Sequence, residues 1–262
     1  MLNKKIIQNR LELITRKWWF FLALILLQFI PPYASKGITS WQDSGYLTGA
    51  VLTNALINNI SILYPVFKII PIILVISIIL YKNKARRIFS IYAGINYALF
   101  AVLQNVGITE QYGLGIVTIN VIMFLIVAIS WFWESIIQKN DFTIRKIPKW
   151  KYLLIILSFI AFWYPTEPKT FTPNFNPLGI ITNMAGLAFC TMTPFYITIL
   201  IIYYPKINTA TLRITSLIGF ILAFYNIWVN FFISPTTLWW NGILHIPLLI
   251  TSVTGIICSY KK

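Results

Sequence analysis

Apolar residues recur in long runs along the chain, and short polar connections separate them. An apolar helix of about 20 residues crosses the roughly 30 Å hydrocarbon core of a bilayer. Because lipid offers no hydrogen-bond partners to open backbone, such runs are expected to be helical. The pattern predicts about eight membrane spans, at residues 18–34, 60–81, 88–106, 114–136, 151–165, 177–203, 214–234 and 239–259.

The composition favours the same fold class. Of the 262 residues, 58% are hydrophobic and only 10% are charged. A soluble domain of this length needs far more polar surface than this chain has. We therefore expect an all-α, polytopic integral membrane protein.

One segment of intermediate polarity precedes the second span. Between Tyr46 and Tyr64 the chain carries Thr53, Asn54 and Asn58, which are costly to expose to lipid. A separate crossing here would also place the basic connections on alternating sides of the membrane. We interpret the segment as an amphipathic or re-entrant approach to the second span.

Basic residues give the expected orientation. The net charge is +15, and only Lys36, Lys68 and Lys169 lie outside five clusters in every second connection or at the chain ends. The clusters are Lys4, Lys5, Arg10, Arg16 and Lys17; Lys82, Lys84, Arg86 and Arg87; Lys139, Arg145, Lys146, Lys149 and Lys151; Lys206 and Arg213; and Lys261 and Lys262. This positive-inside pattern predicts a plasma-membrane protein with both termini in the cytoplasm.

The same distribution indicates the partner of the basic loops. Cytoplasmic basic residues close to spans face the anionic inner leaflet of the lipid bilayer. We therefore expect the membrane surface, and no nucleic acid, to be their partner.

Several features recur in the two halves of the chain. Asn54 precedes Pro65 by eleven residues, and Asn183 precedes Pro194 by the same distance. The later runs beginning "RIFS" and "RITS" also match, and each ends in an asparagine. These matches predict a parallel internal duplication, with one four-helix half at residues 1–136 and another at 137–262. In many transporters the substrate site lies between such halves, near the bilayer midplane.

Few residues could carry acid–base or metal chemistry. Of the six acids, only Glu134 falls inside a predicted span, where we expect it to pair with Lys139 or the basic loop. Because no two acids share the membrane region, neither a catalytic carboxylate pair nor a metal cluster is predicted. Cys190 and Cys258 show no metal-ligand spacing, and no cofactor is expected.

The single histidine, His245, has two interpretations. Pro247 removes a backbone donor and lets the helix open, so His245 could face a polar cavity together with Asn241. Alternatively, a neutral imidazole bonds to another helix. No motif supports a nucleophile activated by His245.

Amides form the most informative polar set. Asn54 and Asn183, and likewise Asn105 and Asn230, occupy matched positions in the two halves. An amide can bind a neutral polar ligand, or another helix, without burying a charge. The predicted ligand site comprises Asn54, Asn183, Asn105, Asn230, His245 and Asn241.

Three functions follow as hypotheses. The first is a carrier or binding protein for a neutral or zwitterionic small molecule, or a lipid, between the two halves. The second is a non-catalytic scaffold or accessory subunit that packs against a membrane-protein partner, which the very short loops would suit. The third, an enzyme using His245 and Glu134, is weakest because these residues are expected toward opposite sides of the membrane. No motif is specific enough to indicate a family.

Overall fold

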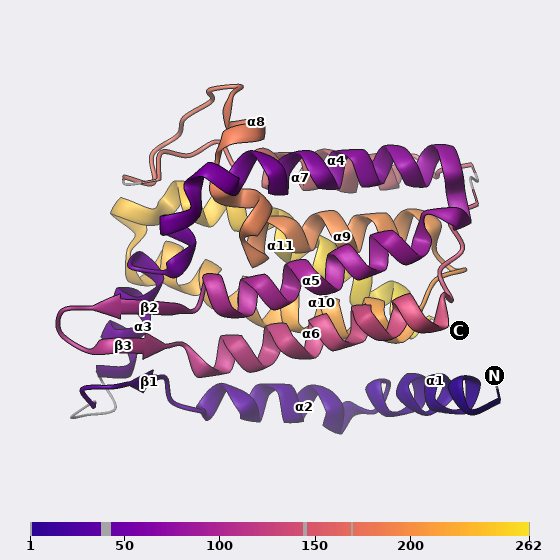
Figure 1. The fold of residues 1–262 in the computed structure, drawn as a ribbon, viewed down its shortest axis with the longest axis horizontal. Coiled ribbons are helices and arrows are strands. Elements are labelled where there is room, and N and C mark those ends of the chain that lie inside the picture. The colour runs from indigo at the N-terminus through magenta and orange to yellow at the C-terminus, as the bar shows by residue number, and fades with distance from the viewer. Residues whose placement is uncertain (1, 38–42, 144–145, 169, 262) are drawn as a thin grey trace.

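The computed structural model describes residues 2–37, 43–143, 146–168 and 170–261. In this part the chain is mostly helical, and the long helices lie side by side along the longest axis (Figure 1). They are α1 (Leu2–Thr15), α2 (Trp18–Leu26), α3 (Asp43–Thr53), α4 (Tyr64–Tyr81), α5 (Arg86–Leu103), α6 (Thr118–Ile137), α7 (Trp150–Trp163), the short α8 (Gly179–Thr182), α9 (Phe189–Tyr203), α10 (Thr209–Trp228) and α11 (Pro235–Tyr260). Of the basic residues named above, Arg145, Lys169 and Lys262 lie outside the described residues.

Within the described residues, four helical segments are long and apolar enough to cross a membrane. They are Leu56–Lys84, Thr118–Ile137, Thr209–Ile233 and Pro235–Tyr260. A fifth span results if Gly179–Leu187 and Phe189–Tyr203, which meet at a 94° bend, are taken together. Two further apolar helices, Trp18–Phe29 and Trp150–Trp163, are shorter than a span. The structure of the described residues thus supports a membrane-embedded helical protein with four to five candidate spans.

The polar segment before α4 forms two short helices. The α3 helix is followed by a 3-10 helix, Leu56–Leu63, that leads directly into α4. Pro65 stands in the first turn of α4, where the missing N–H of proline leaves no helical hydrogen bond broken.

A small antiparallel sheet, which the sequence did not predict, lies beside α3. Strand β3 (Gly113–Ile116) pairs with β1 (Tyr33–Ala34) on one edge and with β2 (Val106–Thr109) on the other. Backbone packs closely here, since a β-carbon at Gly107 would stand 2.7 Å from the Asn54 carbonyl oxygen. A hairpin therefore joins the two predicted spans, because span 88–106 ends at β2 and span 114–136 begins in β3.

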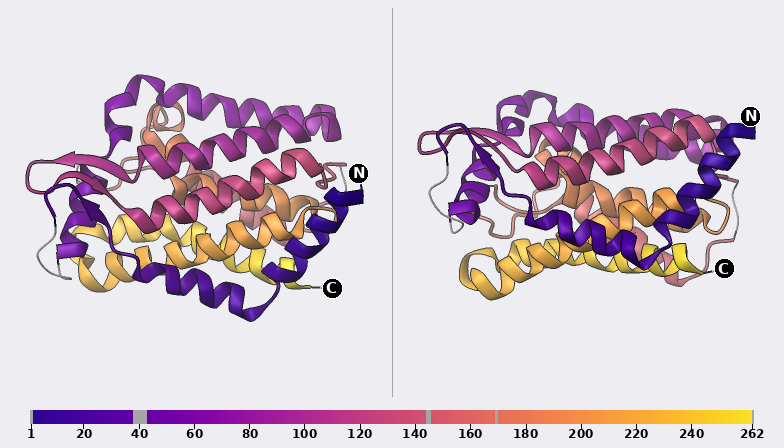
Figure 2. Two further views of the ribbon diagram at one scale, coloured as in Figure 1. Left: turned by 60° about the horizontal axis from the view of Figure 1, so that its bottom comes forward. Right: turned by 90° about the horizontal axis from the view of Figure 1, so that it is seen from below.

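Both chain ends lie at the end of the bundle opposite the sheet (Figures 1 and 2). Contacts between distant segments join this end. Asn83, between α4 and α5, donates to Asp141 Oδ1 at 2.9 Å, and Arg16 donates to the Tyr260 carbonyl oxygen at 2.9 Å. The basic connections α4–α5, α6–α7 and α9–α10 reach the same end. We refer to it as the terminal end, and to the other as the sheet end.

The two halves resemble each other only in part. Helix α5 packs against α6 in the first half, and α10 packs against α11 in the second. However, a hairpin joins α5 to α6, whereas residues 229–234 alone join α10 to α11. The internal duplication therefore stays a prediction.

Aromatic side chains fill the centre where the halves meet. Phe89, Tyr97, Trp131, Phe189 and Tyr196 are all fully buried. Tyr196 contacts the rings of Phe89, Tyr97 and Trp131 at centroid distances of 5.4–5.9 Å. These tilted ring contacts add to the free energy gained by burying apolar area.

Helix α4 lies against the second half mainly at its sheet end. A β-carbon at Gly186 would stand 2.5 Å from the Phe67 carbonyl oxygen, so only glycine allows the turn Met184–Leu187 to approach α4 this closely. Toward the terminal end, an apolar groove separates α4 from α7 and α9. This arrangement positions the candidate site.

Candidate functional site

A polar cavity of about 310 Å³ opens at the sheet end, between the two predicted halves. Its lining comes from the segment before α4 and the first residue of α4, from the loop after α7, and from α8 and the turn that follows it. The lining residues are Asn58, Tyr64, Tyr164, Pro165, Thr166, Pro168, Asn174, Asn176, Gly179, Thr182, Asn183 and Met184. No charged side chain of the described residues lines it. Amides and hydroxyls can both donate to and accept from a neutral polar group.

Local hydrogen bonds shape the loop that carries much of this lining. Tyr164 ends α7 with a φ of +52°, which turns the chain out of the helix. Asn174 Oδ1 accepts from the Asn176 backbone N–H at 3.1 Å, and Asn176 Oδ1 accepts from Leu178 N–H at 3.0 Å. These Asx-type contacts stabilise the turns of the loop.

Asn183 anchors the floor of the cavity. Its Oδ1 accepts from the Ala185 N–H at 3.1 Å, while Nδ2 donates to the Trp163 carbonyl oxygen at 2.6 Å and the Tyr164 carbonyl oxygen at 3.2 Å. This side chain therefore ties the turn after α8 to the end of α7. It is the one predicted site residue among those that line this cavity.

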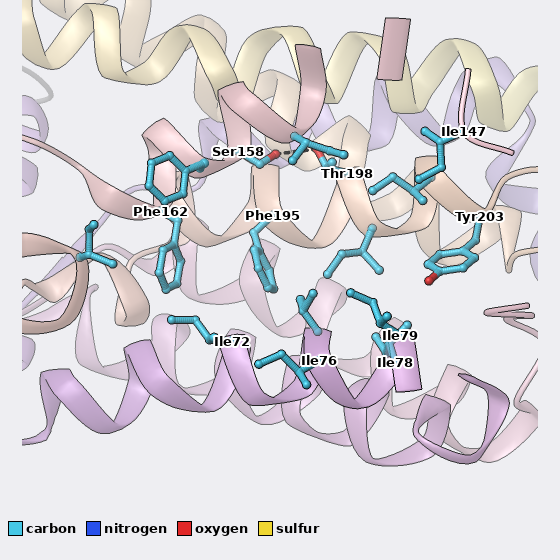
Figure 3. Close-up of a pocket in the computed structure, with 16 residues that line it drawn as sticks. Ile72, Ile76, Ile78, Ile79, Ile147, Ser158, Phe162, Phe195, Thr198 and Tyr203 are labelled. Atoms are coloured by element: carbon cyan, nitrogen blue, oxygen red, sulfur yellow. Dashed lines mark hydrogen bonds between the residues drawn. The ribbon is translucent and has the colours of Figure 1, made fainter. Parts of the chain in front are cut away.

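An apolar groove of about 550 Å³ extends from near the cavity toward the terminal end (Figure 3). Helix α4 forms one wall with Ile72, Ile76 and Ile79, while α7 and α9 form the other. Three of the lining residues carry a hydroxyl, namely Ser158, Thr198 and Tyr203, and the first two bond each other at 2.6 Å. The groove therefore offers an apolar surface for a hydrocarbon chain.

Three of the predicted site residues join a chain of hydrogen bonds beside the cavity. Tyr164 Oη donates to Asn241 Oδ1 at 2.7 Å, and Asn241 Nδ2 donates to Asn230 Oδ1 at 3.0 Å. His245 Nδ1 lies 2.7 Å from the Asn241 carbonyl oxygen. Because a carbonyl can only accept, Nδ1 carries the proton.

The other two predicted residues lie elsewhere. Asn105 is fully buried, donates to the Phe100 carbonyl oxygen and accepts from Asn120 Nδ2, each at 2.8 Å. Asn54 is exposed and donates to the Ala50 carbonyl oxygen at 2.9 Å. The structure therefore does not bring Asn54 and Asn183 together in one cavity.

The geometry separates the two residues of the enzyme hypothesis. Glu134 bonds Asn208 at the start of α10, whereas His245 bonds Asn241, whose amide bonds Asn230 just beyond the end of α10. Helix α10 has 20 residues and spans roughly 30 Å. A shared acid–base site is excluded at this separation. Among the described residues, no group of three His, Cys, Asp or Glu side chains could hold a metal ion.

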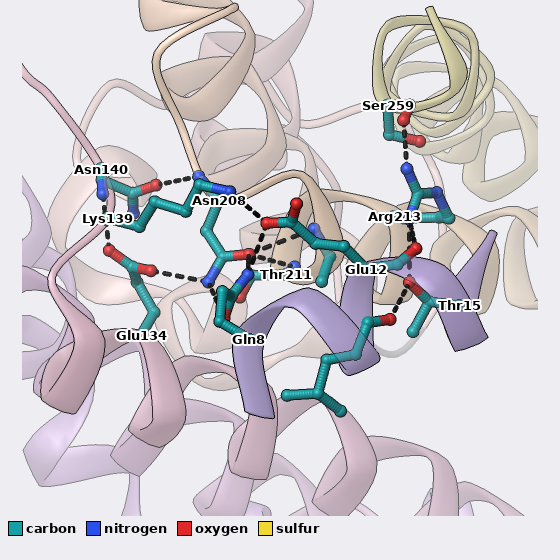
Figure 4. Close-up of polar contacts among 12 residues, drawn as sticks. Gln8, Glu12, Thr15, Glu134, Lys139, Asn140, Asn208, Thr211, Arg213 and Ser259 are labelled. Carbon is teal, nitrogen blue, oxygen red and sulfur yellow. Dashed lines mark hydrogen bonds and ion pairs between the residues drawn. The ribbon is translucent and has the colours of Figure 1, made fainter. Parts of the chain in front are cut away.

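Glu134 belongs to a polar cluster at the terminal end (Figure 4). It is fully buried and accepts from the Asn140 N–H and from Asn208 Nδ2, each at 2.8 Å. Of its two expected partners, Glu134 bonds the basic loop, through the Asn140 backbone, whereas the Lys139 ammonium forms an ion pair with Glu12. Helix α1 supplies Glu12 and thereby closes over this cluster.

Buried basic side chains lie at the C-terminal ends of three helices. Lys68 donates to the Phe162 carbonyl oxygen in the last turn of α7. Lys151 donates to the Ile201 and Ile202 carbonyl oxygens of α9, and Arg213 donates to the Ser259 carbonyl oxygen of α11. The partial negative charge of a helix C-terminus stabilises such cations.

Sequence reasoning missed the loop half of the polar cavity. Asn174 and Asn176 flank Phe175 and precede Pro177, an asparagine and proline pattern that is typical of Asx turns. From the sequence, Asn58 is only one member of the polar segment before α4. The turn pattern could have indicated a structured loop, but not its position over Asn183.

Comparisons of the chain with protein-family models, with curated proteins and with solved structures found no match.

Proposed function

We propose that the protein is a membrane carrier or binding protein for a lipid-like amphiphile, held between residues 1–136 and 137–262. The observation that supports this most is the adjacency of the polar cavity and the apolar groove along α4. Tyr64 lines the cavity, and Ile72 to Ile79 of the same helix line the groove. A ligand with a polar head and an apolar chain matches both surfaces at once.

The groove volume is compatible with a ligand. At about 550 Å³ it lies within the range of roughly 300–1,000 Å³ that is typical of small-molecule sites. Water is a poor occupant because nearly all of the lining is aliphatic or aromatic. In a bilayer, a hydrocarbon chain is the most abundant species able to fill it.

The proposal includes a finer topology. Eight helical segments cross the plasma membrane as a parallel 4+4 duplication, and the terminal end faces the cytoplasm. The connections α4–α5, α6–α7 and α9–α10 gather at that end and carry Lys82, Lys84, Lys139 and Lys206, which supports this orientation by the positive-inside rule. A fluorescent protein that folds only in the cytoplasm, fused after the C-terminus, should be bright. A dark but inserted fusion contradicts the orientation.

A matched pair of α4 variants tests the site. Ile76 lines the groove and is 50% exposed, whereas Ile73 is 54% exposed and is not among the lining residues. Ile76→Trp should fill the groove and reduce the amphiphile that co-purifies, measured by native mass spectrometry in mild detergent. Ile73→Trp should retain it. Equal retention by Ile76→Trp and the unmodified protein would contradict the proposal.

The scaffold hypothesis stays a prediction. The exposed apolar side chains of α2, such as Trp18 at 75% and Leu26 at 58%, fit lipid as well as they fit another membrane protein.

A further inference from the structure

Along one face of α4 the side chains change from polar to cationic to apolar. Tyr64 lines the polar cavity, Lys68 follows one turn later, and Ile72 begins the apolar groove after one more turn. Residues four apart lie on one face of a helix. The buried ammonium of Lys68 thus stands between a polar and an apolar surface.

Lys68 is close to the groove. Its Nζ lies 4.3 Å from the centroid of the Phe162 ring and donates to the carbonyl oxygen of the same residue. Phe162 in turn lines the groove (Figure 3) and stands two residues before Tyr164, which lines the cavity. Lys68 is fully buried and lines neither the cavity nor the groove, so contact between its Nζ and a ligand in the groove requires the Phe162 ring to turn aside.

Lys68 has the fewest described acceptors of the three buried cations. Lys151 Nζ donates to two carbonyl oxygens, and the Arg213 guanidinium donates to Glu12 O, Thr15 Oγ1 and Ser259 O. Lys68 donates to one, although an ammonium has three N–H donors. No carboxylate of the described residues forms an ion pair with it.

The shortage of acceptors around Lys68 matters if this residue lies inside a membrane. A cation inside the bilayer is costly, and such residues commonly mark binding sites or transport paths. The α7 carbonyl supplies part of the compensation. An anionic group beside Phe162 would supply the rest through a charge-assisted hydrogen bond.

We propose that the amphiphile is an anionic phospholipid with a hydroxyl-bearing head group, and that its phosphate binds Lys68. This inference rests on the proposed function. In such a lipid the head group, phosphate and hydrocarbon chain follow one another in the order of cavity, Lys68 and groove. Asn58 and Asn183 suit hydroxyls, whereas a choline or ammonium head would find no carboxylate among the described cavity residues.

A competition between lipids tests the phosphate contact and the hydroxyl-bearing head group separately. The purified full chain is loaded in mild detergent with equal amounts of phosphatidylglycerol, phosphatidylcholine and glucosyl-diacylglycerol, and native mass spectrometry counts the retained lipids. The glucosyl lipid has hydroxyls but no phosphate. Phosphatidylglycerol should be retained about tenfold more than either, the ratio that 1.4 kcal/mol produces.

Two lysine variants identify the phosphate contact. Lys68→Met should remove the preference for phosphatidylglycerol over the glucosyl lipid. Lys151→Met is the matched control, since it also removes a buried cap of a helix end, and it should keep the preference. If Lys68→Met does not fold, Lys68→Arg, which retains the positive charge, must keep the preference.

Each contrary outcome has one meaning. Equal retention of the glucosyl lipid and phosphatidylglycerol by the unmodified protein overturns the role of phosphate but leaves the amphiphile site standing. Equal retention of phosphatidylcholine overturns the head-group assignment. Retention of no lipid at all overturns the proposed function together with this inference.

Discussion

Ser216 occupies the space into which a side chain at Gly255 would extend. A β-carbon at Gly255 would stand 2.1 Å from Ser216 Oγ, and one at Gly219 would stand 2.5 Å from Ser252 Oγ. Both helices therefore carry the pattern Ser-x-x-Gly, and each serine packs over the glycine of the other helix. Small residues allow membrane helices such as α10 and α11 to approach closely.

Gly255→Ala should destabilise the α10–α11 pair. Overpacking of this kind costs about 1–3 kcal/mol, which should lower the midpoint of thermal unfolding in detergent. Ser216→Ala in the same chain removes the nearest atom and should recover part of the loss. Gly49→Ala, on α3 with no atom within 4 Å of its added β-carbon, should have little effect. An equal midpoint for Gly255→Ala and Gly49→Ala would contradict this packing.

Asn58→Ala should weaken ligand binding without unfolding the protein. Asn58 lines the polar cavity and donates to the Thr53 carbonyl oxygen at 2.8 Å. Asn54 donates to the Ala50 carbonyl oxygen at 2.9 Å but is not part of that lining, so Asn54→Ala is a matched control. The rise in unfolding temperature on adding phosphatidylglycerol should shrink for Asn58→Ala alone. Equal rises in the two variants would remove Asn58 from the site.

Gln8→Ala should release α1 from the terminal end. Gln8 is buried, accepts from Trp133 Nε1 at 2.7 Å and donates to Asn208 Oδ1 at 2.8 Å. Leaving buried polar groups without partners costs about 1–3 kcal/mol. Trypsin should then cleave after Arg10 faster than in the unmodified chain, as read by mass spectrometry. The exposed neighbour provides the control, since Asn9→Ala should leave the cleavage rate unchanged.

Asp141 should stay ionised well below the usual range of a carboxyl group. The Thr143 hydroxyl, followed by the Asn83 amide, holds the pKa of Asp141 at about 2. Because folding favours the ionised form, its contribution to stability is complete above the ordinary pKa and is lost as the pH falls through about 2. The chain has only Asp43 and Asp141, so carboxyl-labelled aspartate gives two NMR signals, which Asp43→Asn assigns. A midpoint for Asp141 near 4 would contradict these contacts.

Hydropathy located helices but not the way the chain connects them. The runs around α4, α6, α10 and α11 are apolar enough to show their character in the sequence alone. Strands β2 and β3 have four residues each and contain glycines, so they could not be told from the ends of the neighbouring spans. Their pairing depends on the close approach of Gly107 to the Asn54 backbone, which no local pattern reveals.

For the asparagines too, the sequence indicates the kind of residue but not its hydrogen-bond partner. The sequence indicated that Asn183, Asn230 and Asn241 are polar groups in apolar surroundings. It could not indicate that Asn230 and Asn241 bond each other, which depends on how residues 229–233 pack against α11. Nor could it indicate that Asn183 lines a cavity, which depends on where the loop after α7 lies. Gln8 was harder still, since Asn208 lies 200 residues away in the chain.

Lys68, Lys151 and Arg213 each cap the C-terminal end of a helix. In each contact the residue that supplies the carbonyl oxygen tolerates mutation, whereas the residue that supplies the cation does not. Each acceptor named at a helix end is a backbone carbonyl, which every amino acid possesses, so replacing the side chain of Phe162 or Ser259 leaves the oxygen in place. Each donor is a particular side chain and can be lost in one step. Random variation should therefore break these contacts from the cationic side alone.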